Sequence, residues 1–130
     1  MLSGCSVTFI GNGKKVNCTA KMDYPHASSG SPGYMDAKAH ATCDGAAYST
    51  FTISLQKQNS QGVWIAVPNS SFSQTVKSTV PNMTYNIMTA RGVKCVNGMY
   101  RSVVSISGHI LPLGPPNSTT TYGTPVQVKC

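Results

Sequence analysis

Apolar and polar residues alternate along most of the chain, and residues that favour turns interrupt the alternation at short intervals. In residues 35–43 the odd positions are small and apolar, and polar side chains occupy the positions between them. Residues 49–58 repeat this pattern with larger apolar side chains. A period of two is typical of β-strands with one buried face, and no stretch has a convincing helical period. The pattern therefore predicts strands nearly everywhere.

Turn residues divide this pattern into separate strands. Glycine and asparagine tolerate the positive φ of tight turns, so Gly11-Asn12-Gly13 predicts a hairpin between the first two strands. Asn97-Gly98 predicts a second hairpin later in the chain. The expected strands are residues 6–10, 15–21, 35–43, 49–58, 63–67, 71–80, 84–95, 100–110 and 124–130.

Two segments rich in proline and glycine are expected to be loops. Residues 25–33 suit neither a regular strand nor a helix, and residues 111–117 also break regular structure. Surface loops often supply binding residues, so we take these two loops as candidate contacts. The candidate contact residues in and beside them are Tyr24, His26, Tyr34, Leu111, Pro112, Leu113, Pro115 and Pro116.

Many short strands separated by turns predict an all-β fold, an antiparallel two-sheet sandwich stapled by disulfides. The length of 130 residues suits a single domain, residues 1–130, with one core. Trp64 is the only tryptophan and lies between Val63 and Ile65, so we expect it to point into that core. The alternative is that Trp64 and exposed tyrosines form a platform for sugar rings, with Asn and Ser side chains as hydrogen-bond partners.

The five cysteines are far apart and include no C-x-x-C pair, which favours disulfides over a zinc site. Disulfides persist in oxidising compartments, so the chain is expected to be secreted or displayed on an extracytoplasmic cell surface. A bridge between Cys43 and Cys95 would staple the two sheets together, and Cys130 is expected to tie down the last strand. The cysteines expected in bridges are Cys18, Cys43, Cys95 and Cys130.

Cys5 makes the number of cysteines odd and has two interpretations. Leu2-Ser3-Gly4-Cys5 resembles a bacterial lipobox, in which case Cys5 is lipid-anchored and the other four cysteines close two bridges. No apolar run of signal length precedes Cys5. In the lipobox interpretation, Met1 would therefore be a start placed after the removed signal peptide, and residues 1–5 would be the remnant of the lipobox. Alternatively, Cys5 lies opposite Cys18 across a hairpin that turns at Gly11-Asn12, and the two form a bridge. No segment has the roughly 20 apolar residues of a membrane span.

The chain also resembles an immunoglobulin-like domain and, more loosely, the small secreted β-sandwich proteins of bacteria. The resemblance covers residues 35–110 and implies the sandwich fold, but it assigns no functional residue. It rests on Cys43, Trp64, Tyr85, Cys95 and the turn at Asn97-Gly98, in that order.

The inventory of ionisable residues gives little support for catalysis. The chain has only three aspartates, Asp23, Asp36 and Asp44, and no glutamate, so a pair of catalytic carboxylates is not expected. Its three histidines are scattered without metal-binding spacing, and no G-x-S-x-G motif is present. We therefore expect no catalytic residue, no metal and no cofactor.

The chain carries ten basic residues and a net charge of +7, which favours anionic partners. Lys14 and Lys15 adjoin the first predicted turn, and Lys94 and Arg101 flank the second. These two small clusters do not form a nucleic-acid groove, so a protein or an anionic cell-surface polymer is the expected partner.

Two functional hypotheses follow from these observations. The first is a non-catalytic binding or assembly module, secreted or surface-anchored, that acts through loops and sheet edges. The second is a secreted antagonistic factor, either a basic antimicrobial or toxin component or an enzyme inhibitor. The salt dependence of binding distinguishes the two hypotheses. Binding driven by charge weakens steeply as the salt concentration rises, whereas a shape-matched protein partner is retained.

Overall fold

A computed structural model describes residues 3–130 of the chain as strands joined by turns and loops. The strands account for the all-β class expected from the alternating pattern. They are β1 (Ser3–Gly11), β2 (Lys14–Met22), β3 (His26–Ala27), β4 (Met35–Asp36), β5 (Lys38–Cys43), β6 (Ala47–Gln58), β7 (Trp64–Ala66), β8 (Phe72–Val76), β9 (Thr84–Met88), β10 (Gly98–Ile110), β11 (Asn117–Tyr122) and β12 (Val126–Val128).

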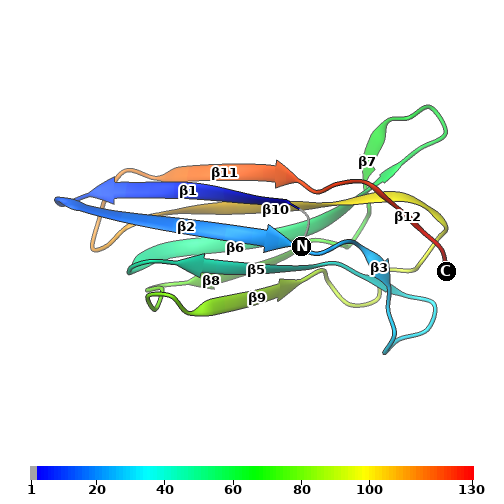
Figure 1. Ribbon diagram of the computed structural model, residues 1–130, viewed down its shortest axis with the longest axis horizontal. Coiled ribbons are helices and arrows are strands. Elements are labelled where there is room, and N and C mark those ends of the chain that lie inside the picture. Colours follow the sequence, from blue (N-terminus) through cyan, green and yellow to red (C-terminus); the bar gives the residue numbers. More distant parts are fainter. Residues whose placement is uncertain (1–2) are drawn as a thin grey trace.

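Two large sheets run along the long axis of the molecule (Figure 1). The four-stranded sheet has the order β1-β2-β5-β9. The six-stranded sheet has the order β11-β10-β6-β7, in which β8 also pairs with β6 and β12 also pairs with β10. All of these pairs are antiparallel. The chain crosses repeatedly between the two sheets, so each sheet is built from segments that are distant in sequence.

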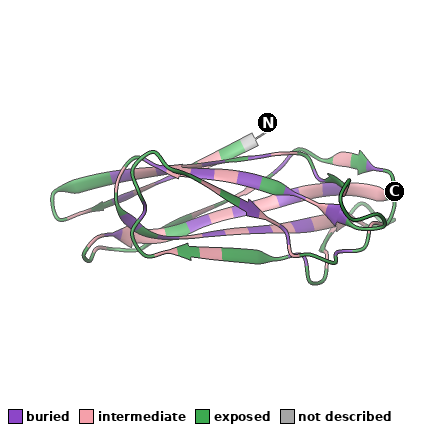
Figure 2. Cartoon of the chain, turned by 90° about the horizontal axis from the view of Figure 1, so that it is seen from below, coloured by how far each residue is buried: buried purple, intermediate pink, exposed green. Residues whose placement is uncertain are grey.

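The buried side chains of the two sheets form one hydrophobic cluster. Figure 2 marks the buried residues, which alternate with more exposed ones along the strands. The central strands of the four-stranded sheet contribute mostly alanine and cysteine, whereas the six-stranded sheet contributes larger side chains. Each large apolar side chain that is fully buried adds about 1.5–3 kcal/mol to stability. The small members are Cys18, Ala20, Ala39, Ala41 and Cys43, and the large members include Phe51, Ile53, Leu55, Val104 and Ile106.

The first predicted hairpin is confirmed, but its turn lies one residue later than expected. Asn12 and Gly13 occupy the two turn positions, with φ of 53° and 70°, as in the two-residue turns that suit the twist of a hairpin. This register places Cys5 opposite Ala20, and Cys18 opposite Val7. The predicted bridge between Cys5 and Cys18 is therefore wrong.

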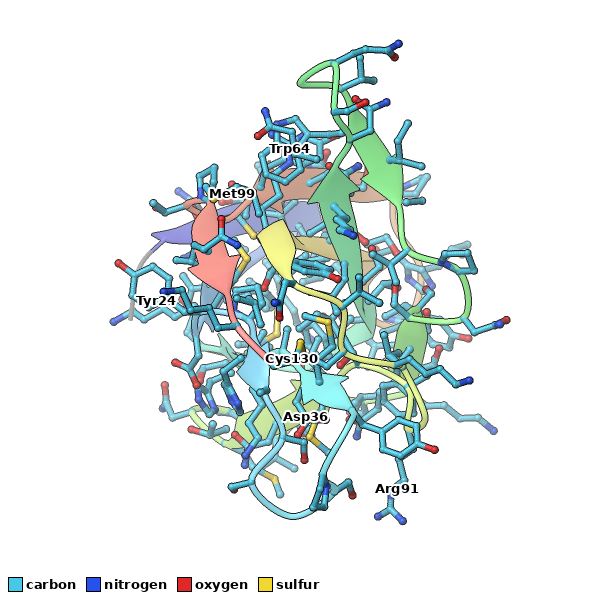
Figure 3. All side chains as sticks on the ribbon, turned by 90° about the vertical axis from the view of Figure 1, so that its right-hand side faces the viewer. Tyr24, Asp36, Trp64, Arg91, Met99 and Cys130 are labelled. Atoms are coloured by element: carbon cyan, nitrogen blue, oxygen red, sulfur yellow. A yellow bond between two sulfur atoms is a disulfide. The ribbon has the colours of Figure 1, made fainter. Side chains whose placement is uncertain are left out.

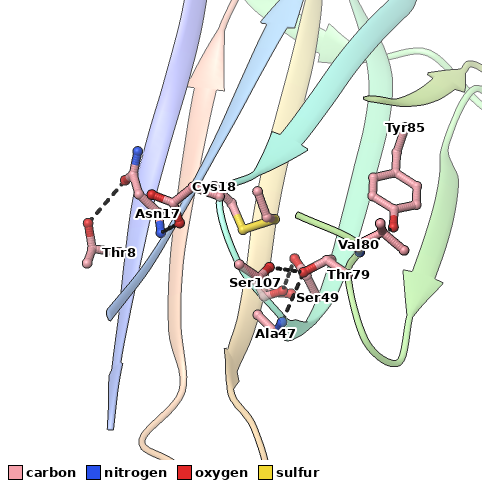
Figure 4. The surroundings of a disulfide bond; sticks show 12 residues. Thr8, Asn17, Cys18, Ala47, Ser49, Thr79, Val80, Tyr85 and Ser107 are labelled. Atoms are coloured by element: carbon pink, nitrogen blue, oxygen red, sulfur yellow. Dashed lines mark hydrogen bonds between the residues drawn. A yellow bond between two sulfur atoms is a disulfide. The ribbon is translucent and has the colours of Figure 1, made fainter. Parts of the chain in front are cut away.

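The predicted pairing of Cys43 with Cys95 is also wrong. Cys18 and Cys43 face each other on neighbouring strands β2 and β5, with their Cα atoms 4.0 Å apart, and they form a disulfide within one sheet (Figure 4). Cys95 lies between β9 and β10 and is bonded to Cys130, which ties down the C-terminal segment as expected. All four cysteines that were expected in bridges are bridged, but the partners depend on which strands are neighbours.

The predicted hairpin at Asn97-Gly98 is wrong because the strands on its two sides belong to different sheets. β9 ends at Met88 and pairs with β5, whereas β10 pairs with β6. The amide of Thr89 donates to the carbonyl of Ala37 (3.0 Å), and the hydroxyl of Thr89 accepts from the amide of Ala37 (3.1 Å). These two bonds fix the point from which residues 89–97 cross to the other sheet.

Two regions of pairing differ from the sequence expectation. β11 was not expected, because its sequence Asn-Ser-Thr-Thr-Thr-Tyr has no apolar alternation. It pairs with one edge of β10, and its outward side chains are exposed, so it needs no alternating apolar residues. Residues 25–33 are not wholly a loop either, because β3 pairs with β4 over two residues.

We predict that mild reduction opens the two disulfides in a fixed order. Cys18 and Cys43 are fully buried, whereas Cys130 is exposed and Cys95 is partly exposed. Because thiol–disulfide exchange requires access to a sulfur atom, a low concentration of dithiothreitol should open Cys95–Cys130 first. Differential alkylation followed by peptide mass spectrometry will measure the order. Simultaneous opening of both bridges in the folded protein would contradict this expectation.

Candidate binding surfaces

The structure places the two candidate loops at opposite ends of the molecule (Figure 1). Residues 111–116 join β10 to β11 beside the β1–β2 turn, where the Asn12 side-chain amide donates to the carbonyl of Leu113 (2.6 Å), and Asn117, the last residue of the predicted loop, begins β11. Lys14 and Lys15 lie at this same end, at the start of β2. Residues 25–33 lie at the other end. Of the candidate contacts, Leu111 is half-buried and the others are exposed, namely Tyr24, His26, Tyr34, Pro112, Leu113, Pro115 and Pro116.

Lys94 and Arg101 lie toward the second end, but on different surfaces. Lys94 is exposed and forms an isolated bridge with Tyr34, whereas Arg101 points outward from β10. Figure 3 looks onto this end of the molecule, where Trp64 and Cys130 are labelled. The ten basic residues therefore do not converge on one patch that includes all four predicted contacts.

A cluster of one cation and two aromatic rings lies on the outer side of the β6–β7 hairpin and joins it to β10 and β11. The Arg101 guanidinium carbon lies 4.5 Å from the centre of the Trp64 ring and 4.4 Å from that of Tyr122. Arg101 Nε also donates to Gln56 Oε1 (2.7 Å). Trp64 is only half-buried, so the prediction that it lies in the core is wrong. The physical reason is that β7 lies at an edge of the sheet and Trp64 stacks there on a cation.

The other side of the same hairpin borders a concave region lined mainly by apolar atoms. We call it the apolar hollow, with a volume of about 390 Å³ and Tyr100, Val67, Ile65 and Val96 among its lining residues. Ile65 and Val96 are 50% and 54% exposed, which is high for large apolar side chains. Two lysines also line it, Lys57 and Lys94.

Hydrogen bonds hold two residues that line the hollow, Val67 and Val96. The buried hydroxyl of Ser70 accepts from the amide of Leu55 (3.0 Å) and donates to the carbonyl of Val67 (2.8 Å). The Tyr100 hydroxyl donates to the carbonyl of Val96 (2.7 Å). Burial raises the pKa of Tyr100. The protonated phenol is therefore available to hold the Val96 segment in place at neutral pH.

The described histidines and carboxylates form no constellation typical of catalysis. His40 Nε2 lies 3.4 Å from an Asp23 carboxylate oxygen, and its Nδ1 contacts the Asn86 side chain. Both ring nitrogens of His40 are thus engaged, and within residues 3–130 neither of them bonds to a hydroxyl or a thiol that it could activate. Among residues 3–130, no three His, Cys, Asp or Glu side chains group together as a metal site would require. The same residues contain no helix long and apolar enough to cross a membrane.

Cys5 is the free cysteine of the described chain. Its side chain is half-buried and packs against the edge of the core. Burial raises the pKa of the Cys5 thiol. The thiol is therefore mostly protonated at neutral pH and is a poor nucleophile. Lipid attachment at Cys5 stays a prediction from the sequence.

Sequence reasoning missed most of the hollow. Lys94 was a candidate contact, but Lys57, Ile65 and Val96 were not. A signal was present in residues 63–67, where Val63, Ile65 and Val67 alternate on one side of a very short strand. Sequence reasoning instead places Trp64 on the buried side of this strand, because the sequence does not show that this hairpin extends beyond the opposite sheet.

We predict that Arg101→Ala lowers the free energy of unfolding by about 1–2 kcal/mol, because it removes two cation–π contacts and one hydrogen bond. Chemical denaturation followed by Trp64 fluorescence will measure the change. Arg91→Ala is the matched control, since Arg91 is exposed and has no hydrogen bond or ring contact within residues 3–130. Its expected effect is within about 0.5 kcal/mol. Equal losses in the two variants would contradict a clamping role for Arg101.

We also predict a difference in alkaline stability between the wild type and Cys5→Ala. The folded-state pKa of Cys5 is raised, so its contribution to stability is complete below the unfolded-state pKa and is lost as pH rises through the folded-state value. The free energy of unfolding should therefore fall more steeply at alkaline pH in the wild type than in Cys5→Ala. Urea titrations from neutral to alkaline pH will measure both slopes, and identical slopes would contradict the prediction.

The two sides of the β6–β7 hairpin thus differ in chemistry, with a stacked cation outside and an apolar hollow inside. No protein-family model matches the chain, and no curated protein matches it in sequence.

Proposed function

We propose that this protein is a non-catalytic, extracellular binding module that captures a segment of another protein in the apolar hollow. The observation that carries the proposal is the exposure of Ile65 and Val96 beside a hollow that is also lined by Lys57 and Lys94. Concave, mainly apolar surfaces with a few convergent polar groups are the usual form of binding sites.

The chemistry of the hollow indicates the kind of segment that fits. An apolar side chain of the partner would cover Ile65 and Val96 and remove their surfaces from water. A neighbouring carboxylate would lie near the ammonium groups of Lys57 and Lys94, which have no acidic partner among residues 3–130. β7 pairs only with β6 within the described chain, so its other edge offers backbone groups to an extended segment.

An immunoglobulin-like sandwich is the fold that we propose for this module. The order β2-β5-β9 in one sheet and β11-β10-β6-β8 in the other supports it, because the chain crosses between sheets after β5, β8 and β9. This is the Greek-key pattern typical of that family of folds. The two disulfides of this small chain are compatible with an extracellular location, and we propose that it is secreted or held at a cell surface.

A displayed library of random peptides, selected against the folded protein, tests the proposal. We expect enrichment of peptides that place an apolar residue next to aspartate or glutamate. An enriched peptide, labelled with fluorescein, should bind Lys94→Gln about three- to tenfold more weakly than the wild type, in line with the loss of about 0.7–1.4 kcal/mol. Ile65→Asn should weaken binding by a similar factor, and fluorescence anisotropy at physiological salt will measure both.

Lys15→Gln is the matched control, because it removes the same charge at the opposite end of the molecule. It should leave the affinity unchanged. If no peptide is enriched, or if Lys15→Gln and Lys94→Gln weaken binding equally, the hollow is not the binding site. Binding that also vanishes between low and physiological salt would favour the second hypothesis, a basic antagonistic factor that acts through its net charge of +7.

A further inference from the structure

The outer face of the six-stranded sheet carries two rows of hydroxyl side chains. The residues of both rows on β6 and β10 alternate with the buried Phe51, Ile53, Val104 and Ile106, so their side chains point away from the core. The first row crosses β11, β10, β6 and β8 as Thr120, Ser105, Thr52 and Ser73. The second row repeats it with Ser118, Ser107, Thr50 and Thr75. We call these rows the hydroxyl face.

The hydroxyl face is uncharged, although the chain carries ten basic residues. Two pairs of its hydroxyls bond to each other, Thr50 with Thr75 (2.9 Å) and Thr52 with Ser73 (2.8 Å). The hydroxyls on β10 and β11 form no hydrogen bond with residues 3–130, so they are free to donate to and accept from a ligand. An anion would find no compensating charge in these rows, whereas a polyhydroxylated neutral ligand would find partners for its own donors and acceptors.

Aromatic side chains border the hydroxyl face at both ends of β10. At one end Tyr48 and His109 stack with ring centres 5.1 Å apart, beside a second concave region of about 470 Å³. Thr50, Ser107 and Ser118 of the hydroxyl face also line that concave region. At the other end lies the Arg101 cluster with Trp64 and Tyr122. Positions 101 and 109 are eight residues apart, which corresponds to about 26 Å along an extended strand.

We propose that the hydroxyl face binds a neutral, β-1,4-linked polysaccharide that lies along β10. Such a chain is extended, presents hydroxyl groups along both edges and presents the C–H faces of its rings above and below. The members of the hydroxyl rows on β11 and β6 lie on either side of β10, so they bond to the two edges of the chain. The exposed ring of Tyr48 packs against a sugar face. This activity is separate from the capture of a protein segment, because the hydroxyl face and the apolar hollow share no residue.

The four-stranded sheet supplies a matched comparison within the same molecule. Its outer face also has one hydroxyl row, formed by Ser6, Thr19, Thr42 and Thr84. Charged or ionisable side chains, among them Lys21 and His40, adjoin that row. It has no neighbouring second row of hydroxyls and no stacked aromatic pair among the described residues. A ligand that recognises hydroxyls alone would bind both faces, whereas the proposed polysaccharide binds only the hydroxyl face.

Depletion from solution by microcrystalline cellulose and by chitin tests the proposal. We expect at least one of these solids to retain the wild-type protein equally at physiological and at raised salt, because the contact is uncharged. The double variant Thr50→Val/Thr52→Val keeps strand-favouring side chains and should weaken retention about tenfold. Tyr48→Ala, at an exposed position, should weaken it by a similar factor. Circular dichroism will verify that each variant is folded.

The control variant Thr19→Val/Thr42→Val makes the same change on the other sheet and should be retained like the wild type. Lys94→Gln should also be retained, so failure of the hollow and failure of the hydroxyl face are distinguishable. The proposal is overturned if neither solid retains the wild-type protein, or if raised salt abolishes its retention. It is also overturned if Thr50→Val/Thr52→Val and Thr19→Val/Thr42→Val weaken retention equally. A dimer in sedimentation that Thr50→Val/Thr52→Val disrupts would also overturn it, because a second copy would then cover the face.

Discussion

Close packing of small side chains against large ones determines how the two sheets of this protein meet. Alanine and cysteine on β2 and β5 leave room for Phe51, Ile53 and Leu55 from the opposite sheet. Protein interiors are packed to a nearly constant density, so a small side chain on one layer requires a large one on the other. The disulfide between Cys18 and Cys43 lies within this small-residue layer and is fully buried.

The sequence predicts the strands well wherever this packing imposes a strict alternation. Every second side chain is buried in residues 38–43 and in residues 47–55 of β6, where strands were expected over residues 35–43 and 49–58. The first of these expected strands is divided, because Met35 and Asp36 form β4 and pair with β3. The sequence does not reveal which strands become neighbours. Cys43 therefore received the wrong partner, and residues 84–110 were joined in one hairpin although β9 and β10 lie in different sheets. Disulfide partners and strand order depend on long-range pairing, which local alternation does not encode.

The candidate surfaces were predictable only in part, for the same reason. Lys94 was expected to make contacts because of its charge, but Ile65 and Val96 line the same hollow only because β6 pairs with both β7 and β10. The hydroxyl face depends on the register of four strands, of which β11 was not recognised. Proline-rich segments indicated loops as contacts, whereas the chemically distinctive surfaces lie on strands. Rigid strands fix the spacing between side chains more closely than loops do.

The β6–β7 hairpin also limits which changes of length the chain tolerates. Gln56 and Trp64 point to the outer face, whereas Lys57 and Ile65 border the hollow. Because the two faces of a strand alternate at every residue, one residue inserted after Leu55 would exchange the two sets of side chains. Ile65 would then face Arg101, and Trp64 would enter the hollow. Insertions or deletions of two residues in these strands keep each side chain on its face. Changes of length are also tolerable within the turn at residues 59–62, because the length of the turn does not determine which face a strand residue occupies.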